Sequence, residues 1–129
     1  MFILGFTGTR EGMSLRQFSI VTSILQEAKP GEVHHGGCKG ADAGFHALAK
    51  KLGIKVVLHP PVSMVSQVIF AADEMRKPKP YLTRNREIVN EVQGLLACPV
   101  QKQEVLRSGT WATIRYARKK GVPVHIIFP

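Results

Sequence analysis

The stretch VHHGGCKGADAGFHALAKK, residues 33–51, joins an apolar run to a helical pattern through a turn that contains three glycines. A strand that runs directly into a helix is the repeating unit of α/β proteins. The turn also holds two histidines, a cysteine and a lysine. Three kinds of site therefore compete for it: a metal site, a reactive thiol and a phosphate-binding loop.

The same order of strand and helix recurs along the chain. Residues 1–6 are an apolar strand that ends in the turn TGTREG. A helix follows, because Ser14 and Gln17 have the spacing of a capping box and apolar residues recur at helical intervals until Pro30 and Gly31. The strand of the opening stretch comes next, and its helix is expected to end at Gly53.

The second half of the chain repeats this order. Strands are predicted in IKVVLHPP (54–61), GLLACPV (94–100) and VPVHIIF (122–128), and helices in LTRNREIVNEV (82–92), with Thr83 as N-cap, and TWATIRYARKKG (110–121). Within residues 62–80, Val65, Ile69 and Ala72 indicate one short helix, and RKPKP is expected to be exposed and extended.

Apolar strands separated by helices are typical of a parallel sheet covered on both faces. Right-handed crossovers make such a sheet doubly wound. The sequence therefore predicts one Rossmann-like α/β domain over residues 1–129, mostly parallel, with about five strands in the order 3-2-1-4-5. Residues 62–80 are interpreted as a variable insertion.

Charge and cysteine content narrow the choice of partners. The net charge is +9, from 18 Lys and Arg against 9 Asp and Glu, and it favours anionic partners. Two cysteines at unpatterned spacing favour a reducing, cytoplasmic setting. The apolar start MFILGF is too short for a signal peptide or a membrane span, so no membrane partner is expected.

Three loops are predicted at the carboxyl edge of the sheet, where ligands of this fold class bind: TGTREG, GGCKGAD and CPVQKQEVLRSGTW. Each runs into a helix N-terminus, where unpaired N–H groups favour an anion. The glycines of these loops let a phosphate approach the backbone closely. The sequence contains neither a Walker lysine motif nor a complete GxGxxG pattern.

Four arginines lie at or just before predicted helix starts: Arg10, Arg84, Arg86 and Arg107. The helix dipole disfavours a cation there by roughly 0.3–1 kcal/mol. We therefore expect a bound anion to compensate, unless these side chains simply face solvent. On this hypothesis, replacing Arg84 with alanine leaves the stability of the free protein nearly unchanged and weakens ligand binding.

The opening stretch is best interpreted as a phosphate-binding loop. Adjacent strand residues point to opposite faces, so His34 and His35 cannot readily share one ion, and one of them should be buried while the other lies near the ligand edge. Cys98 should end a strand roughly 10 Å from Cys38, too far for a disulfide. A zinc site that includes Cys38 is the weaker alternative, and we expect no metal and no cofactor.

Five motifs, GFTGTR, HHGGCKGAD, YLTRNREIV, LLACP and RSGTWATIRYARKKGVPV, together resemble the SLOG superfamily, and most closely its YspA-like, DUF2493-type members. Similar families include LOG lysine-decarboxylase-like phosphoribohydrolases, molybdenum-cofactor-carrier-like proteins and DNA-processing protein A (DprA). The resemblance covers nearly the whole chain except residues 62–77. It implies a Rossmann-like fold that binds nucleotides or nucleotide-derived ligands, and a homo-oligomer, in which the apolar VSQVIFAA (65–72) would be core or interface.

The resemblance implies ligand contacts at Gly8, Thr9, Arg10, Gly36, Gly37, Asp42, Arg84, Asn85, Ser108, Gly109 and Thr110, and the loops add Lys39 and Arg107 to the candidate set. Arg84 would pair with a phosphate oxygen. Asp42 would accept from a ribose hydroxyl, or is only an acid at a helix start. Trp111 either covers a base or lies in the core.

One position departs from the LOG pattern. The signature PGGxGTxxE ends in a glutamate that the chemistry needs, and Thr113 stands at that position here. We therefore expect a sensor, carrier or sequestering module without a catalytic residue. The alternatives are a nucleoside-monophosphate phosphoribohydrolase-like hydrolase and a single-stranded DNA binder in the manner of DprA, although Tyr81 is the only aromatic residue in the most basic stretch, RKPKPYLTRNR.

Overall fold

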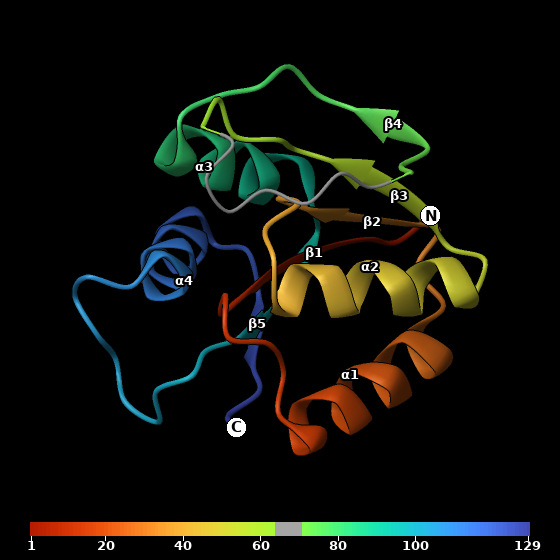
Figure 1. Cartoon of the computed structure of the whole chain (residues 1–129), viewed down its shortest axis with the longest axis horizontal. Coiled ribbons are helices and arrows are strands. Elements are labelled where there is room, and N and C mark those ends of the chain that lie inside the picture. The colour runs from red at the N-terminus through yellow and green to blue at the C-terminus, as the bar shows by residue number, and fades with distance from the viewer. Residues whose placement is uncertain (64–70) are drawn as a thin grey trace.

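The computed structural model describes residues 1–63 and 71–129 (Figure 1). Its strands are β1 (Ile3–Gly8), β2 (Glu32–His35), β3 (Lys55–Leu58), β4 (Glu74–Met75), β5 (Gly94–Cys98) and β6 (Val124–Ile126). Its helices are α1 (Leu15–Ala28), α2 (Ala41–Lys51), α3 (Tyr81–Glu91) and α4 (Gly109–Lys120). Among the described residues, no helix is both long and apolar enough to cross a membrane.

The strands form one sheet in the order β4-β3-β2-β1-β5-β6, and every described pair is parallel. The predicted α/β Rossmann-like class and the order of the five predicted strands are therefore confirmed. The sequence missed β4, a two-residue strand at the edge. It forms because the Arg76 N–H donates to the carbonyl of Leu58, and Val56 and Asp73 exchange hydrogen bonds beside it.

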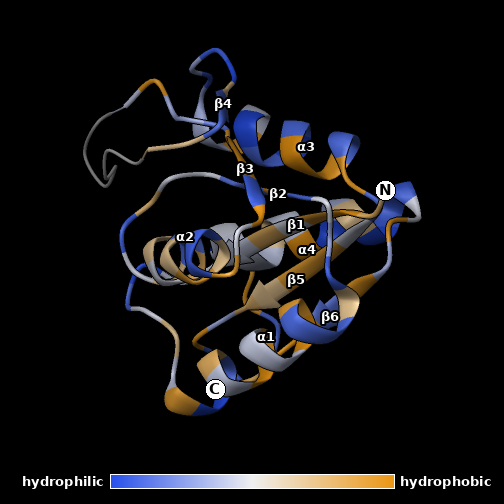
Figure 2. Cartoon of the chain, turned by 90° about the vertical axis from the view of Figure 1, so that its right-hand side faces the viewer, coloured by the Kyte–Doolittle hydropathy of each residue, from blue (hydrophilic) through white to orange (hydrophobic). Residues whose placement is uncertain are grey.

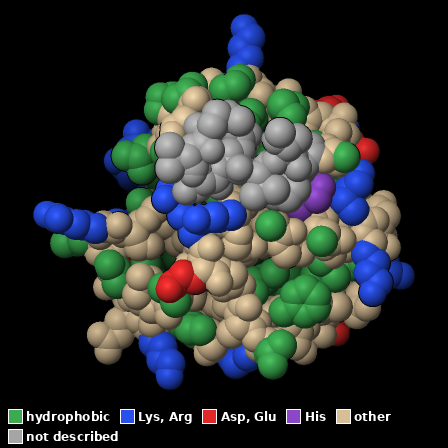
Figure 3. Space-filling view, in the orientation of Figure 1, with side chains coloured by type: hydrophobic (Ala, Val, Ile, Leu, Met, Phe, Trp, Pro, Cys, Tyr) green, Lys and Arg blue, Asp and Glu red, His purple; other side chains and the backbone are tan. Residues whose placement is uncertain are grey.

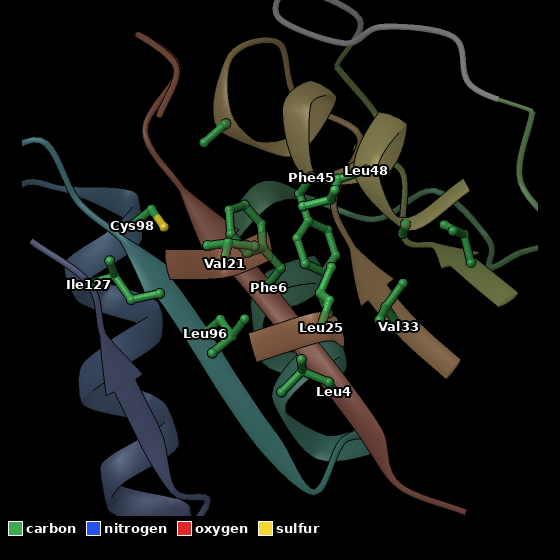
Figure 4. Close-up of a cluster of buried hydrophobic side chains, with 13 residues drawn as sticks. Leu4, Phe6, Val21, Leu25, Val33, Phe45, Leu48, Leu96, Cys98 and Ile127 are labelled. Carbon is green, nitrogen blue, oxygen red and sulfur yellow. The ribbon is translucent and has the colours of Figure 1, made fainter. Parts of the chain in front are cut away.

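Helices cover both faces of the sheet (Figure 1). On the face of α1 and α2, the rings of Phe6 and Phe45 stack with centroids 4.2 Å apart, and Val21 and Leu25 pack beside them (Figure 4). Each fully buried side chain of this size contributes about 1.5–3 kcal/mol.

The opposite face of the sheet carries a smaller core. Leu95 of β5 packs there against Val89 of α3 and Ala117 of α4. Adjacent residues of β5 thus serve the two cores, as expected for a strand buried on both faces. Figure 2 shows the matching division of α3, which has a hydrophobic and a hydrophilic side.

The first helix starts as its sequence predicts. The Ser14 hydroxyl accepts from the Gln17 N–H, and the Gln17 side chain accepts from the Ser14 N–H, so the capping box is present. The Gln17 amide also donates to the carbonyls of Pro99 and Ile127, at 2.8 Å each. These bonds connect the start of α1 to the ends of β5 and β6.

The start of α3 differs from the prediction, and the short helix predicted before it lies mainly outside the described residues. Thr83 is not an N-cap, because α3 already begins at Tyr81 and Pro80 occupies the cap position without a side-chain hydrogen bond. Proline tolerates a helix start because its backbone has no N–H to satisfy there. The short helix expected between Val65 and Ala72 falls mainly on residues 64–70, outside the described residues.

Candidate ligand site at the carboxyl edge of the sheet

A cavity of about 460 Å³ opens where the loops after β1, β2 and β5 meet the start of α3. The structure brings eleven of the thirteen candidate residues to its wall: Gly8, Thr9, Arg10, Gly36, Asp42, Arg84, Asn85, Arg107, Ser108, Gly109 and Thr110. Sequence reasoning missed Glu11, Cys38, Tyr81 and Gln101, which also line it. The residues that line it follow the carboxyl ends of β1, β2 and β5 or belong to the starts of the helices there, and β1 runs toward the left of Figure 1.

Two candidate residues do not line this cavity. Gly37 turns away from it: its φ of +72° is left-handed, and a β-carbon there would lie 2.7 Å from Leu58. Lys39 is exposed on the outside of the loop. In a tight turn, residues one or two positions apart can point in opposite directions. Their spacing in the sequence therefore does not reveal which of them face the cavity.

The first two loops are held against each other by backbone contacts. The Ala41 N–H donates to the carbonyl of Thr9 at 2.9 Å. Gly40 precedes it with φ +85° and ψ −124°, and a β-carbon at this position would collide with the backbone of Arg10. Only glycine permits this conformation and this close approach. The glycine therefore closes the junction between two loops.

The glycine loop uses its own N–H groups internally. The Asp42 Oδ2 atom accepts from the N–H groups of Gly36, at 3.2 Å, and Cys38, at 3.3 Å. The Gly37 N–H donates to His35 Nδ1 at 3.0 Å. These three N–H groups are therefore already bonded within the loop, to a buried carboxylate and an imidazole, and are not free donors for a phosphate.

Asp42 is buried and has one oxygen to spare. Its Oδ1 atom has no hydrogen-bond partner among the described residues. Burial raises the pKa of this carboxyl from 3.8 to about 6, although the positive charge of Arg84 and the two N–H donors act in the opposite direction. A buried acceptor without a donor costs free energy, and Asp42 belongs to the cavity wall.

Arg84 is part of the structural frame. It is buried, at 3% exposure, and its Nη1 donates to the carbonyls of Gly36, at 2.5 Å, and His59, at 3.0 Å. Its Nε donates to Asn85 Oδ1 at 2.7 Å. The expectation that removing it would leave stability unchanged is therefore wrong. The sequence placed Arg84 at the helix start, whereas it lies one turn inside α3 and faces the glycine loop.

The free donors of the cavity lie at the start of α4. Ser108 caps this helix by accepting from the Trp111 N–H at 3.2 Å. The N–H groups of Gly109 and Thr110 have no hydrogen-bond partner among the described residues, as is usual in a first helical turn. Arg107 is exposed just before them and forms no ion pair with a described acid. This helix start therefore presents free N–H donors and an exposed arginine at the cavity.

Arg10 and Tyr81 complete the basic side of the cavity. The Arg10 guanidinium lies 5.4 Å from the centroid of the Tyr81 ring, and that of Arg84 lies 5.3 Å from it. Arg10 is exposed and also lacks an ion pair with a described acid. Arg86 differs: it lies in the second turn of α3 over the ring of Tyr116, so it does not belong to a helix start.

The histidines of the opening stretch and both cysteines of the chain are buried. His34 and His35 lie on opposite faces, as expected, but both are buried and neither lines the cavity. His35 instead contacts His46 at 2.9 Å and supports the glycine loop. Cys38 and Cys98 are free thiols, and burial raises the pKa of both, so neither is poised as a thiolate.

Trp111 belongs to the core. It is 3% exposed and packs with Ala97 and Ile114, and it does not line the cavity. The interpretation that it covers a base is therefore wrong. A tryptophan three residues into a helix whose start faces the ligand points back toward the sheet.

Arg84→Ala should lower the free energy of unfolding by roughly 3 kcal/mol, because it leaves the carbonyls of Gly36 and His59 without their buried donor. Arg84→Lys should recover part of this loss, since an ammonium reaches fewer acceptors. Arg107→Ala, which removes an equal but exposed charge, is the control and should change stability by less than about 0.5 kcal/mol. Urea denaturation measures all three, and equal stabilities would refute the structural role.

Asp42 should make the protein less stable as pH rises. Its pKa is raised in the folded state, so its contribution is fully favourable below about pH 4 and is lost as pH passes through about 6. Asp42→Asn keeps an oxygen for both N–H donors and cannot ionise. At pH 7 it should therefore be more stable than the natural protein by roughly 2–3 kcal/mol, with little difference at pH 3.5.

Asp73→Asn provides the control for this titration. The Asp73 pKa is lowered, chiefly by the bond from the Val56 N–H, so its stabilisation is lost as pH falls. The two substitutions should therefore have opposite pH dependence in parallel denaturation series. An Asp42→Asn curve that runs parallel to that of the natural protein between pH 4 and 7 would show that Asp42 is not perturbed.

Comparison with known proteins supports the fold. No protein-family model and no curated protein matches the sequence. Among solved structures, the molybdenum cofactor binding protein of Rippkaea orientalis has a TM-score of 0.77 at 19% identity, covering 99% of this chain and 77% of its own. DprA of Streptococcus pneumoniae has a TM-score of 0.71 at 20% identity, covering 98% of this chain and 50% of its own.

DprA of Helicobacter pylori, whose structure concerns single-stranded DNA binding, has a TM-score of 0.69 at 17% identity and covers 97% of this chain and 64% of its own. The chain thus spans half to two thirds of the length of the DprA proteins. At these identities the likeness concerns the fold. The chain has the Rossmann-like fold of these proteins, which is the fold that its resemblance to the SLOG superfamily implies.

Proposed function

We propose that this chain binds a nucleotide or a nucleotide-derived phosphate ligand in the cavity at the carboxyl edge of the sheet, as a sensor, carrier or sequestering module. One observation carries the proposal: the cavity combines unpartnered backbone donors beside two free arginines with a buried carboxylate oxygen that lacks a donor. A ligand with a phosphate and a neighbouring hydroxyl satisfies both.

The phosphate would lie at the start of α4. The N–H groups of Gly109 and Thr110 point out of the helix there, and the helix dipole adds to their attraction for an anion. Arg107 and Arg10 supply two positive charges there, and neither side chain forms an ion pair with a described acid. This arrangement moves the phosphate away from the glycine loop, whose own donors are used internally.

The sugar would lie toward Asp42. A ribose hydroxyl that donates to Oδ1 would satisfy the one buried carboxylate oxygen without a partner and would favour the ionised form. The cavity volume of about 460 Å³ falls within the range of small-molecule sites. Ligand binding should therefore remove part of the cost of keeping Asp42 buried.

The chemistry of the site favours binding over hydrolysis. Thr113, at the position of the LOG glutamate, donates its hydroxyl to the carbonyl of Gly109 at 2.9 Å and has no acid–base function there. Asp42 is engaged by two N–H donors through one oxygen. The phosphoribohydrolase alternative would require another carboxylate at the reacting carbon, and Glu11 is the other acid on the cavity wall.

A second candidate function is binding of single-stranded nucleic acid, which a basic groove favours. The groove lies between α3 and α4, has a volume of about 440 Å³, and is lined by Arg86, Arg115, Lys119 and Lys120 with no acidic residue. It shares Leu82 and Asn85 with the ligand cavity. Tyr116 lies in it, flanked by Arg86 and Lys120. On the face shown in Figure 3, basic side chains are spread widely and acidic ones are sparse.

Calorimetry with mono-, di- and cyclic nucleotides and ADP-ribose derivatives should find at least one ligand that binds below millimolar. Arg107→Ala should weaken that ligand by about 1.5–3 kcal/mol, the contribution of a hydrogen bond to a charged group. Arg118→Ala removes the same charge from the other end of α4, outside both cavities, and should leave affinity within twofold. A protein that binds none of these compounds and co-purifies with no nucleotide by mass spectrometry would refute the proposal.

The second candidate has a separate test. Oligothymidylate binding, followed by fluorescence anisotropy, should fall steeply between 50 and 200 mM salt and fall further in a Lys119→Gln, Lys120→Gln double variant. The same double variant should leave mononucleotide affinity unchanged. Oligonucleotide binding that is absent at 50 mM salt, or that ignores both lysines, would exclude the groove as a nucleic-acid site.

A further inference from the structure

A chain of four ionisable groups, three of them buried and one half-buried, lies beside the ligand site, on the face of the sheet that α3 covers. Glu32 Oε2 contacts His34 Nε2 at 2.6 Å, His34 Nδ1 contacts His59 Nε2 at 2.7 Å, and His59 Nδ1 contacts Glu87 Oε1 at 2.6 Å. His34 is 1% exposed and His59 is fully buried. The residues come from β2, from the end of β3 and from α3.

These contacts contain one hydrogen too few. Three short contacts need three hydrogens, and two neutral imidazoles carry two. When the end carboxylates are ionised they can only accept, so each takes the outer N–H of its histidine. His34 Nδ1 and His59 Nε2 then face each other with lone pairs at 2.7 Å. In that state a cation, either a proton or a metal ion, would bridge the two nitrogens; a proton on one of the end carboxyl groups is the other source of the third hydrogen.

A third donor converges on the same point. A Glu91 carboxylate oxygen and the two inner nitrogens lie within 4.8 Å of one another, with Oε1 at 3.9 Å from His34 Nδ1. Arg76 donates to this Oε1 through Nε and Nη2, at 3.0 and 2.8 Å. The other oxygen, Oε2, has no hydrogen bond or ion pair to a described residue. Two imidazoles and one carboxylate are a ligand set typical of Zn²⁺ and neighbouring divalent ions.

We propose that His34 Nδ1, His59 Nε2 and the Glu91 carboxylate form a binding site for a divalent transition metal of the Zn²⁺ type, with water as the fourth ligand. Glu32 and Glu87 hold the outer N–H of each histidine, the carboxylate–histidine arrangement that orients metal ligands. Lys55 and Lys79 contact the outer oxygens of these two carboxylates, away from the inner nitrogens.

The two imidazoles require only a small adjustment to bind an ion between them. Zn–N bonds of about 2.0–2.1 Å at a tetrahedral angle place two nitrogens roughly 3.3 Å apart. The imidazoles must therefore separate by roughly 0.6 Å as the ion replaces the shared proton. The site joins β2, β3 and α3, and the His59 carbonyl also accepts from Arg84, so a metal here would brace the frame of the ligand cavity.

The spacing of these residues along the chain does not indicate such a site. His34 and His59 are 25 residues apart, and the metal hypotheses raised by the opening stretch concerned the adjacent pair His34 and His35 and a zinc site at Cys38. His35 and Cys38 lie elsewhere: His35 contacts His46 on the other face, and Cys38 lines the ligand cavity. The proposal does not depend on the proposed nucleotide function.

The test uses the full, untagged chain after chelator treatment and dialysis. Titration with Zn²⁺ by calorimetry should show one saturable site with a dissociation constant of micromolar or below, and Zn²⁺ should raise the melting temperature. Co²⁺ should give the visible absorption of a four-coordinate site. Glu91→Gln should weaken Zn²⁺ binding at least tenfold, and His59→Gln should abolish it. His125→Gln removes an exposed histidine and should change nothing.

Circular dichroism identifies any variant that fails to fold; Glu91 is partly exposed, so Glu91→Gln keeps the test decisive even if His59→Gln unfolds. Absence of one-to-one binding would overturn the proposal and leave a shared proton as the buried cation. Binding that persists unchanged in Glu91→Gln, or that is lost in His125→Gln, would also overturn it.

Discussion

The site depends on the two backbone hydrogen bonds that the buried carboxylate of Asp42 accepts. By accepting from the N–H groups of Gly36 and Cys38, it fixes the turn between β2 and α2. Because of these hydrogen bonds, the loop N–H groups are not free to bind a phosphate. The free N–H donors of the cavity lie at the start of α4. They also leave one buried oxygen that a donor group of a ligand would satisfy. The raised pKa of Asp42 reflects the free-energy cost of burying its ionised carboxylate.

A second layer of buried polar groups supports the first. Arg84 links the carbonyl of Gly36 to that of His59, and His59 continues into the chain of histidines and glutamates on the α3 face. Buried polar networks are costly when incomplete and rigid when every member is satisfied. The ligand cavity thus rests on side chains whose positions are set by other buried charges, and a cation between His34 and His59 would complete that frame.

Much of the fold could be predicted because it follows from local patterns. The apolar strands, the capping box of Ser14 and Gln17, and the glycine after α4 all act within a few residues of the chain. The direction of side chains within a tight turn, and contacts between distant residues, leave no such pattern. Gly37 and Lys39 therefore failed as cavity residues, and Arg84 proved to be buried. The pairing of His34 with His59 was invisible for the same reason.

The central claim is that the anion binds at the start of α4, while the N–H groups of the glycine loop stay bonded to Asp42. Amide NMR spectra recorded during titration with inorganic phosphate and then with adenosine monophosphate test it directly. The account predicts large shifts and slowed hydrogen exchange at Gly109 and Thr110, with Gly36 and Cys38 already protected before ligand is added. Fast exchange at Gly36 and Cys38 in the free protein, followed by protection on binding while α4 stays unchanged, would contradict it.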